Sequence, residues 1–291
     1  MTESHLKKSW FSPVTARLYD WYDDANDLEM WQRLAVSEGS PVLELGSGTA
    51  RVLLALARAG HDVTGVEISP AMLEVARRKI AAEPEAVQKR ITLVQADMTD
   101  FDLPQRFRFG FIGCNTLCEV STFEGQKRAL SRLYHHLEPG GLAVVSVPNP
   151  ILGRYPSGGP MSSDEAVEHL VWESVNPATG KLTRHLNASW SDPLEQKRYM
   201  HFAFEEQEMD GSWTRSEPLP PGEWGAMRYL HRFELHLMLE LCGFEIENVW
   251  GGYDQRPLTV DSGMIFAARR PQLPIANASA HVGKEGVARG G

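Results

Sequence analysis

The chain has 291 residues, of which 42% are hydrophobic and 23% are charged, a composition that supports a large folded core and excludes disorder throughout. Lysine and arginine number 29 against 38 aspartates and glutamates, a formal net charge of −9, which argues against nucleic acid or an anionic membrane surface as the main partner. No apolar run reaches the ~18 residues of a membrane helix, and the first residues lack the apolar stretch of a secretory signal, so we expect a cytoplasmic protein without a membrane partner.

Between Pro41 and Val147, short apolar runs alternate with helical patterns. The expected strands are Pro41–Leu45, Asp62–Ile68, Ile91–Ala96, Phe109–Cys114 and Leu142–Val147. The expected helices are Arg51–Ala59, Ala71–Ala82 and Phe123–Leu137. Ser69 followed by Pro70 is a typical helix start. Strands that alternate with helices predict an α/β fold with a parallel sheet.

After Pro148 the pattern changes to antiparallel hairpins. The expected hairpin strands are Glu168–Val175, Lys181–Trp190, Arg198–Glu206 and a segment from Trp213. A helix at Arg232–Leu241 and strands at Phe244–Val249 and Met264–Ala268 then complete the main sheet. We therefore divide the chain into an N-terminal helical lid (1–40), a core (41–150), an antiparallel insertion (151–228), the last core elements (229–270) and a flexible tail (271–291).

A glycine-rich turn follows the first expected strand and opens a helix. Gly46 and Gly48 allow a ligand to approach the backbone closely, and the helix N-terminus offers N–H groups. Glu67 ends the next strand, where a carboxylate can accept both ribose hydroxyls of an adenosine. The pair predicts a nucleoside cofactor at the carboxyl ends of parallel strands.

The identity of that cofactor follows from two departures from the dinucleotide fingerprint. Arg51 stands where G-x-G-x-x-G has its third glycine. Glu44 places a carboxylate beside the position of a pyrophosphate, which would repel it. S-adenosyl-L-methionine (SAM) has no phosphate and carries an ammonium and a sulfonium, so the turn favours SAM over NAD.

The segment VLELGSGTARVLLALARAGHDVTGVEISPAMLEVARRKI resembles the first motif and second strand of the class I SAM-dependent methyltransferases, of the bacterial small-molecule, natural-product kind. Ala96-Asp97-Met98 and LEPGGLAVVSV resemble further motifs of that family, although Ala50 stands where a third glycine is usual. The resemblance covers about Tyr19 to Arg269. It implies a Rossmann-like, seven-stranded, mostly parallel sheet with helices on both faces, and an antiparallel insertion that covers the active site.

The resemblance also implies the cofactor contacts. Tyr19 and Tyr22 belong to a segment similar to the family's lid, Glu67 to its ribose-binding acid, and Asp97 to the acid that contacts the adenine amino group. The residues expected to contact SAM, and the product S-adenosyl-L-homocysteine (SAH), are Tyr19, Tyr22, Glu44, Gly46, Ser47, Gly48, Arg51, Glu67, Ile68, Met72, Asp97, Met98, Cys114 and Asn115. Three cysteines without a completing His or Cys pattern predict neither a disulfide framework nor a metal site.

Methyl transfer needs an acceptor lone pair in line behind the methyl group, and proximity supplies most of the rate. Asn115 follows the fourth strand and is expected to orient the sulfonium or the acceptor. Glu119 is a candidate base or acceptor anchor, with helix capping or solvation as the alternative. His201, in the insertion, is a further candidate for the acceptor pocket, although a purely structural role remains open.

These residues predict methyl transfer from SAM to a nitrogen, oxygen or carbon atom of a small molecule, in secondary metabolism. Two other classes stay open: a SAM-binding protein that transfers no methyl group, and an NAD-dependent oxidoreductase, against which Glu44 speaks. The fold alone does not choose among them. A homodimer through the exposed edges of the insertion is a further expectation.

Overall fold

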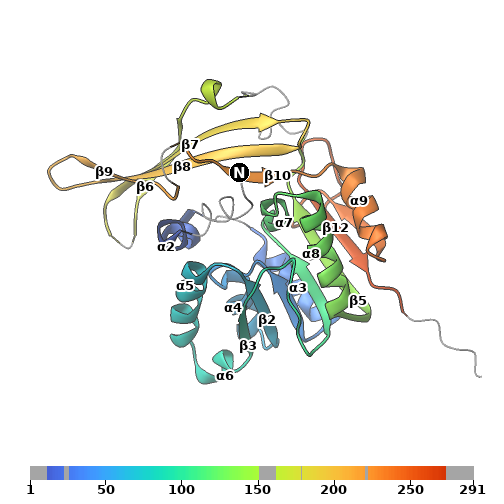
Figure 1. The fold of residues 1–291 in the computed structure, drawn as a ribbon. Helices are drawn as coiled ribbons and strands as arrows, with labels where there is room; N and C mark the ends of the chain where they lie inside the picture. Colours follow the sequence, from blue (N-terminus) through green and yellow to red (C-terminus); the bar gives the residue numbers. More distant parts are fainter. Residues whose placement is uncertain (1–11, 23–25, 151–161, 178, 220–221, 273–291) are drawn as a thin grey trace, which may run out of the picture.

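The fold contains two β-sheets that lie one above the other (Figure 1). We describe it from a computed structural model, for residues 12–22, 26–150, 162–177, 179–219 and 222–272. The larger sheet has seven strands in the order β11-β12-β5-β4-β1-β2-β3, and the smaller has five, in the order β10-β8-β7-β6 with β9 paired to β8. The expected N-terminal lid (1–40) and C-terminal tail (271–291) lie partly outside the described residues.

Strands of the larger sheet run parallel except for β12, which is antiparallel to both β5 and β11. Their bounds are Val42–Leu45 (β1), Val63–Glu67 (β2), Ile91–Gln95 (β3), Phe107–Ile112 (β4), Leu137–Val147 (β5), Glu245–Trp250 (β11) and Met264–Arg269 (β12). Every residue of β1 and β2 is buried, as expected of central strands covered on both faces. The predicted seven-stranded, mostly parallel α/β sheet is confirmed.

Helices cover both faces of this sheet. Their bounds are Pro13–Tyr22 (α2), Leu28–Glu38 (α3), Arg51–Arg58 (α4), Pro70–Ala81 (α5), Glu85–Gln88 (α6), Thr116–Glu119 (α7), Phe123–His136 (α8) and Arg232–Leu241 (α9). Buried side chains of α8 and α9 form one apolar cluster with the sheet, and those of α3 and α4 form a second cluster on the other face. The two clusters form the apolar core on either side of the sheet.

Local signals in the sequence fix several helix ends. The Ser69 hydroxyl accepts a hydrogen bond from the Met72 amide at 3.2 Å, so the predicted cap of α5 is confirmed. Thr122 caps α8 in the same way through Gly125. Gly243, just beyond α9, has φ of +97°, as a helix C-terminus requires.

Two expectations for the core were wrong in detail. The predicted fifth strand begins at Leu142, whereas β5 begins at Leu137 and includes Gly140. The Gly140 amide donates to the Arg270 carbonyl at 2.8 Å, and this pairing extends the strand through a segment expected to be only a turn. The short helices α6 and α7 were not expected, because four residues are too few for a hydrophobic period.

The smaller sheet is the antiparallel insertion. Its strands are His169–Val175 (β6), Leu182–Asp192 (β7), Lys197–Gln207 (β8), Trp213–Ser216 (β9) and Gly225–Arg228 (β10), preceded by a 3₁₀ turn at Ser163–Glu165. The hairpins β6–β7 and β8–β9 were predicted from their turns. Strand β10 was not, since its four residues carry no alternating pattern.

Helix α2 lies between the two sheets (Figure 1). On its upper side, the Trp21 ring meets the Trp172 ring of β6 edge to face, with centroids 4.7 Å apart. On its lower side, Asp20 pairs with Lys79 of α5. The insertion is also joined to the core where Arg228 donates to Gln126 of α8 at 2.8 Å. The contacts of Trp21 with the insertion and of Asp20 with α5 therefore hold α2 between the two layers.

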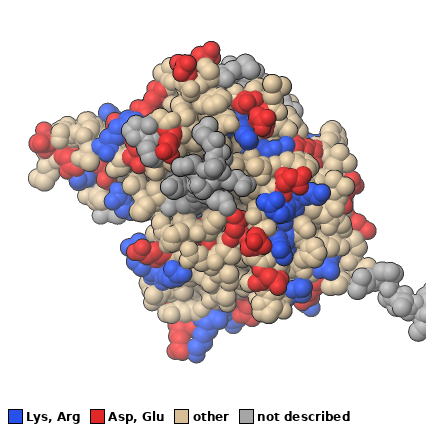
Figure 2. Space-filling model, viewed as in Figure 1, with Lys and Arg blue, Asp and Glu red and all other residues tan. Residues whose placement is uncertain are grey.

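Acidic and basic side chains are interspersed over the face shown in Figure 2. Most arginines of the insertion pair with carboxylates; Arg215, for example, contacts Glu168 at 2.6 Å. Within the described part of the chain, no helix is long and apolar enough to cross a bilayer. No group of three or more His, Cys, Asp or Glu side chains suited to a metal occurs among the same residues.

Candidate active site

The glycine-rich turn after β1 has the geometry of a ligand-binding loop. Gly46 and Gly48 have φ of +78° and +53°, and Ala50, at the position where the resemblance leads one to expect a third glycine, has φ of +64°. A Cβ on Gly46 would lie 2.3 Å from Cγ2 of Thr116, whereas one on Gly48 would meet nothing within 4 Å. Position 46 therefore has no room for a side chain, whereas the space next to Gly48 is open.

Glu67 lies at the carboxyl end of β2, and the turn holds it. One carboxylate oxygen accepts the Gly48 amide at 2.9 Å and the other accepts the Ser69 amide at 2.8 Å. Burial raises the pKa of Glu67, although these backbone N–H groups act in the opposite direction. The carboxylate is thereby fixed at the edge of the sheet, where it can accept hydrogen bonds from the paired hydroxyls of a ribose.

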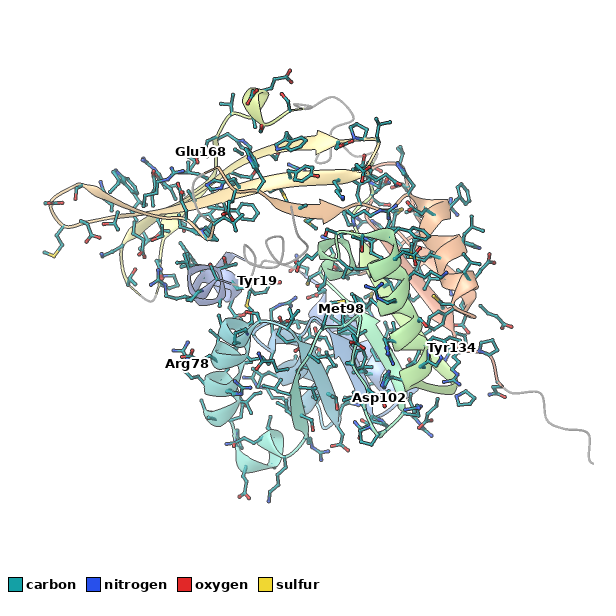
Figure 3. The ribbon with its side chains drawn as sticks, viewed as in Figure 1. Tyr19, Arg78, Met98, Asp102, Tyr134 and Glu168 are labelled. Atoms are coloured by element: carbon teal, nitrogen blue, oxygen red, sulfur yellow. The ribbon has the colours of Figure 1, made fainter. Side chains whose placement is uncertain are left out.

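A cavity of about 860 Å³ opens at this edge of the sheet. Nine of the residues expected at the cofactor or catalytic site line it, namely Tyr19, Gly46, Gly48, Glu67, Ile68, Met72, Asp97, Met98 and Glu119. Tyr19 on α2 and Met98 beyond β3 both lie on the side of the core that faces the insertion (Figure 3). The structure thus brings together residues from five separate segments of the sequence.

Asp97 lies beyond the end of β3, and its carboxylate accepts the Thr99 amide at 2.9 Å. Met98 is partly buried and packs against the apolar cluster under α8. A carboxylate beside an apolar side chain suits an adenine, which has an amino donor and a flat ring. The cavity therefore offers fitting groups for adenine and ribose.

Glu44 has a buried, unpaired carboxylate oxygen that suits the ammonium group of SAM. Its side chain is only 6% exposed, and Oε2 has no hydrogen-bond partner. Burial holds the pKa of Glu44 well above its usual value; Arg51 partly offsets this, and Asp27 and Glu67 add smaller upward contributions. An ammonium would satisfy both the unpaired oxygen and the charge. Neither Glu44 nor Ser47, whose buried Oγ is also unpartnered, lines the described cavity.

Arg51 and Cys114, two further expected cofactor contacts, also lie outside that lining. The Arg51 guanidinium forks onto Asp27 with distances of 2.6 and 2.9 Å and contacts the Cys114 sulfur at 3.3 Å. Asp27 is fully buried. Its importance was not foreseen, because nothing in the local sequence links an aspartate before α3 to the glycine turn.

Glu119 ends the short helix α7 and lines the cavity. Burial, with a smaller contribution from Glu67, raises the pKa of Glu119 to about 8. A carboxyl group with such a pKa can exchange a proton near neutral pH. A position in the cavity wall differs from the alternative given for Glu119, a helix cap or a solvated side chain.

The turn that precedes α7 separates this cavity from another. Cys114 and Asn115 have φ of +48° and +62°, values uncommon for residues other than glycine and costly by about 1–3 kcal/mol each. Asn115 lines a second cavity of about 1060 Å³, while Thr116 and Glu119 line the first. The backbone turn is therefore the wall shared by the two cavities.

Residues of the second cavity were mostly missed by the sequence reasoning. They come from the end of β5, the segment after β11, the start of β12 and strand β8, and include Ser146, Asn149, Tyr253, Arg256 and Arg198. The Tyr253 hydroxyl lies 3.0 Å from the Ser146 hydroxyl. No local motif marks these positions, because segments far apart in the sequence supply the lining together.

Two expected site residues stand apart. His201 on β8 lines neither described cavity; its ring contacts the Glu223 carbonyl at 3.1 Å and lies 3.7 Å from Glu217. Tyr22 ends α2, but its side chain lies outside the described part of the chain. The lid contributes Thr15 as well as Tyr19 to the first cavity.

Similarity to known proteins agrees with this geometry. Residues 42–141 match the family described as "Methyltransferase domain". The CcbJ methyltransferase from Streptomyces caelestis has a similar structure, with a TM-score of 0.75 and 26% identity over 91% of this chain and 99% of that one. The match in fold therefore includes the insertion as well as the core.

Two relatives share part of the sequence. The dTDP-4-amino-2,3,4,6-tetradeoxy-D-glucose N,N-dimethyltransferase of Saccharopolyspora spinosa is 29% identical over 45% of this chain and 49% of its own length. The dTDP-3-amino-3,4,6-trideoxy-alpha-D-glucopyranose N,N-dimethyltransferase of Streptomyces venezuelae is 32% identical over 43% of this chain and 50% of its own. Each match spans about half of the relative.

Proposed function

Because this chain belongs to the class I SAM-dependent methyltransferases, we propose that it transfers the methyl group of SAM to a small-molecule acceptor and releases SAH. The position of the turn after β4 carries the proposal. Asn115 lines the second cavity, and its neighbour Thr116 lines the cofactor cavity. Two cavities that share one turn suit two reactants, since proximity and orientation dominate methyl transfer.

The cofactor cavity supplies binding and orientation. Gly46 and Gly48 allow the backbone to approach SAM, Glu67 holds its ribose and Asp97 its adenine. Bound SAM supplies an electrophilic methyl group on a sulfonium, which becomes a neutral thioether as the acceptor lone pair takes the methyl carbon. Glu119, in its ionised form, takes the proton that the acceptor loses.

The second cavity is the proposed place of the acceptor. Hydroxyl and amide groups of Ser146, Asn149 and Tyr253 line it, and such groups bind hydroxyl-bearing molecules well. Strand β8 contributes Arg198 to the same cavity, so the insertion takes part in the acceptor site. His201, which lines neither cavity, stays a candidate only if the acceptor reaches beyond the described lining.

We propose an amine on a sugar-like molecule of secondary metabolism as the acceptor. Both partial relatives are named as N,N-dimethyltransferases of amino deoxysugars. Oxygen and carbon acceptors are the alternatives. Incubation of the chain with methyl-labelled SAM and a panel of amino sugars, free and nucleotide-linked, tests the class; label in hydroxylated but never in aminated compounds would contradict it.

The role of Glu119 is testable by substitution. Glu119→Gln keeps the size of the side chain but cannot accept a proton, so we expect kcat to fall by about 10²- to 10⁴-fold with unchanged SAH affinity. In the wild type, the base is active only when ionised, so kcat should rise with pH through about 8. The Gln variant should lose this rise.

Glu124→Gln is the matched control, since Glu124 is an exposed residue on the first turn of α8. It should leave both kcat and its pH dependence unchanged. Equal kcat in Glu119→Gln and the wild type would remove Glu119 from the mechanism. An unchanged SAH affinity with a lost pH response would support it.

A SAM-binding protein without transferase activity is the alternative function, and tight SAH binding without turnover on the whole panel would favour it. The oxidoreductase alternative has less support, since the similarities are to methyltransferases. Calorimetry with NAD⁺ separates it from both.

A homodimer is also part of the proposal. Strand β6 is an edge of the smaller sheet, and Leu170, Val171 and Val175 are 51%, 49% and 56% exposed on it. An apolar edge strand readily pairs with another chain. Sedimentation of the wild type and of Val171→Lys checks this, and a monomeric wild type at micromolar concentration would contradict it.

A further inference from the structure

Asp27 joins three segments that meet beside the cofactor site. It precedes α3, is fully buried, and accepts both guanidinium N–H groups of Arg51 at 2.6 and 2.9 Å. The Trp31 indole donates to the same carboxylate at 2.8 Å. The Cys114 sulfur lies 3.6 Å away. One buried carboxylate thus contacts the residue after the glycine turn and the residue before Asn115.

The bidentate hydrogen bonds between Arg51 and Asp27, which we call the fork, determine which carboxylate pairs with the Arg51 guanidinium. Arg51 is the cation that acts on Glu44, yet the described residues show no ion pair between Arg51 and Glu44. Bidentate pairing is geometrically specific, so Asp27 fixes the position of the Arg51 guanidinium. Asp27 and Glu67 are also the negative charges that act on Glu44. Glu44 is left buried, with Oε2 unpartnered.

We propose that Asp27 is a positioning residue for cofactor binding: by holding Arg51, it leaves the Glu44 carboxylate available to the ammonium of the amino-acid end of SAM. This inference rests on the proposed function, because it assumes that SAM occupies the site. It goes beyond that function in assigning a role to a residue that touches no reacting atom. Without the fork, Arg51 would neutralise Glu44, and the ammonium would lose its partner.

The test compares two ligands that differ at the amino-acid end. SAH carries the ammonium, whereas 5′-methylthioadenosine keeps the adenosine and the sulfur but lacks the amino acid. Calorimetry on Asp27→Asn should show SAH affinity reduced by about tenfold to a hundredfold, with 5′-methylthioadenosine affinity within twofold of wild type. Equal losses for both ligands, or none for either, would overturn the proposal.

Trp31→Phe is the matched control, because it removes another hydrogen bond to Asp27 while leaving the Arg51 fork in place. It should not alter the ratio of the two affinities. If Asp27→Asn does not fold, Arg51→Lys serves instead. Lysine keeps the charge but lacks the fork, so the ratio should fall in the same direction, and an unchanged ratio would overturn the proposal.

A double substitution separates positioning from a general structural role. In a Glu44→Gln background there is no charge for Arg51 to neutralise, so Asp27→Asn should change SAH affinity by less than about twofold. A loss as large as in the wild-type background would overturn the proposal. Wild-type protein that binds neither ligand would instead refute the cofactor site itself, and with it the proposed function.

Discussion

The carboxylates at the cofactor edge of the core and those of the insertion lie in opposite electrostatic environments. In the insertion, the Arg215 guanidinium lowers the pKa of Glu168. At the cofactor edge of the core, burial raises the pKa values of Glu44, Glu67 and Glu119. Glu168 forms an ion pair with Arg215, whereas among the described residues no ion pair joins an arginine or lysine to Glu44, Glu67 or Glu119. The contrast indicates that the three carboxylates at the cofactor edge serve a ligand rather than stability, since burying a carboxylate without a cationic partner costs stability.

The two cavities also differ in what supports their walls. The cofactor cavity lies on β1 and β2, which are buried throughout, and uses glycine backbone at fixed positive φ. The second cavity uses side chains from the segments after β5 and β11 and from the half-exposed strand β8. We infer that substitutions at the first cavity act through shape, with large effects, and that those at the second act through single hydrogen bonds, with small ones.

The largest effect is expected for Gly46→Val. The new Cβ would lie 2.3 Å from Cγ2 of Thr116, at a backbone φ of +78°. Overpacking and left-handed backbone strain together should lower SAH affinity by at least about 100-fold. Calorimetry measures this, with a melting curve to report the folded fraction.

Gly211→Val in the β8–β9 hairpin is the control for that variant. Gly211 has a similar φ of +85°, but a Cβ there would meet nothing within 4 Å. It should lose stability from strain alone and keep wild-type SAH affinity. If both valine variants bound SAH equally well, the contrast between the two regions would fail.

The sequence predicts the cofactor cavity better than the second one for a physical reason. Gly46, Gly48 and Glu67 belong to a contiguous strand–turn–helix–strand unit, whose local geometry is set by glycines and by Ser69 at the start of α5. Short-range patterns of this kind can be recognised in a single sequence. The same holds for the order of strands and helices in the core, which was expected correctly except at short elements and at the start of β5.

The remainder depends on contacts between distant residues. The fork from Asp27 to Arg51, and the pairing of Ser146 with Tyr253, join segments with no shared motif. Arg51 was expected at the cofactor, but its partner decides its orientation, and only the folded chain brings that partner close. Glu119 illustrates the intermediate case: its position was foreseen, while its raised pKa follows from burial that no sequence pattern reports.

The smallest effect is expected for Tyr253→Phe in the second cavity. The phenol is partly buried, and desolvation raises its pKa, so it stays a neutral donor and acceptor beside Ser146. Removing one hydroxyl should raise the KM of the acceptor by about threefold to tenfold, while SAH affinity stays unchanged.

Tyr134→Phe, on α8 and outside both cavities, is the matched control and should alter neither the KM of the acceptor nor the SAH affinity. Saturation curves with an acceptor from the labelled panel, together with SAH calorimetry, provide the measurement. A loss of SAH affinity in Tyr253→Phe would place the second cavity within the cofactor site, because only a shared site couples that hydroxyl to SAH.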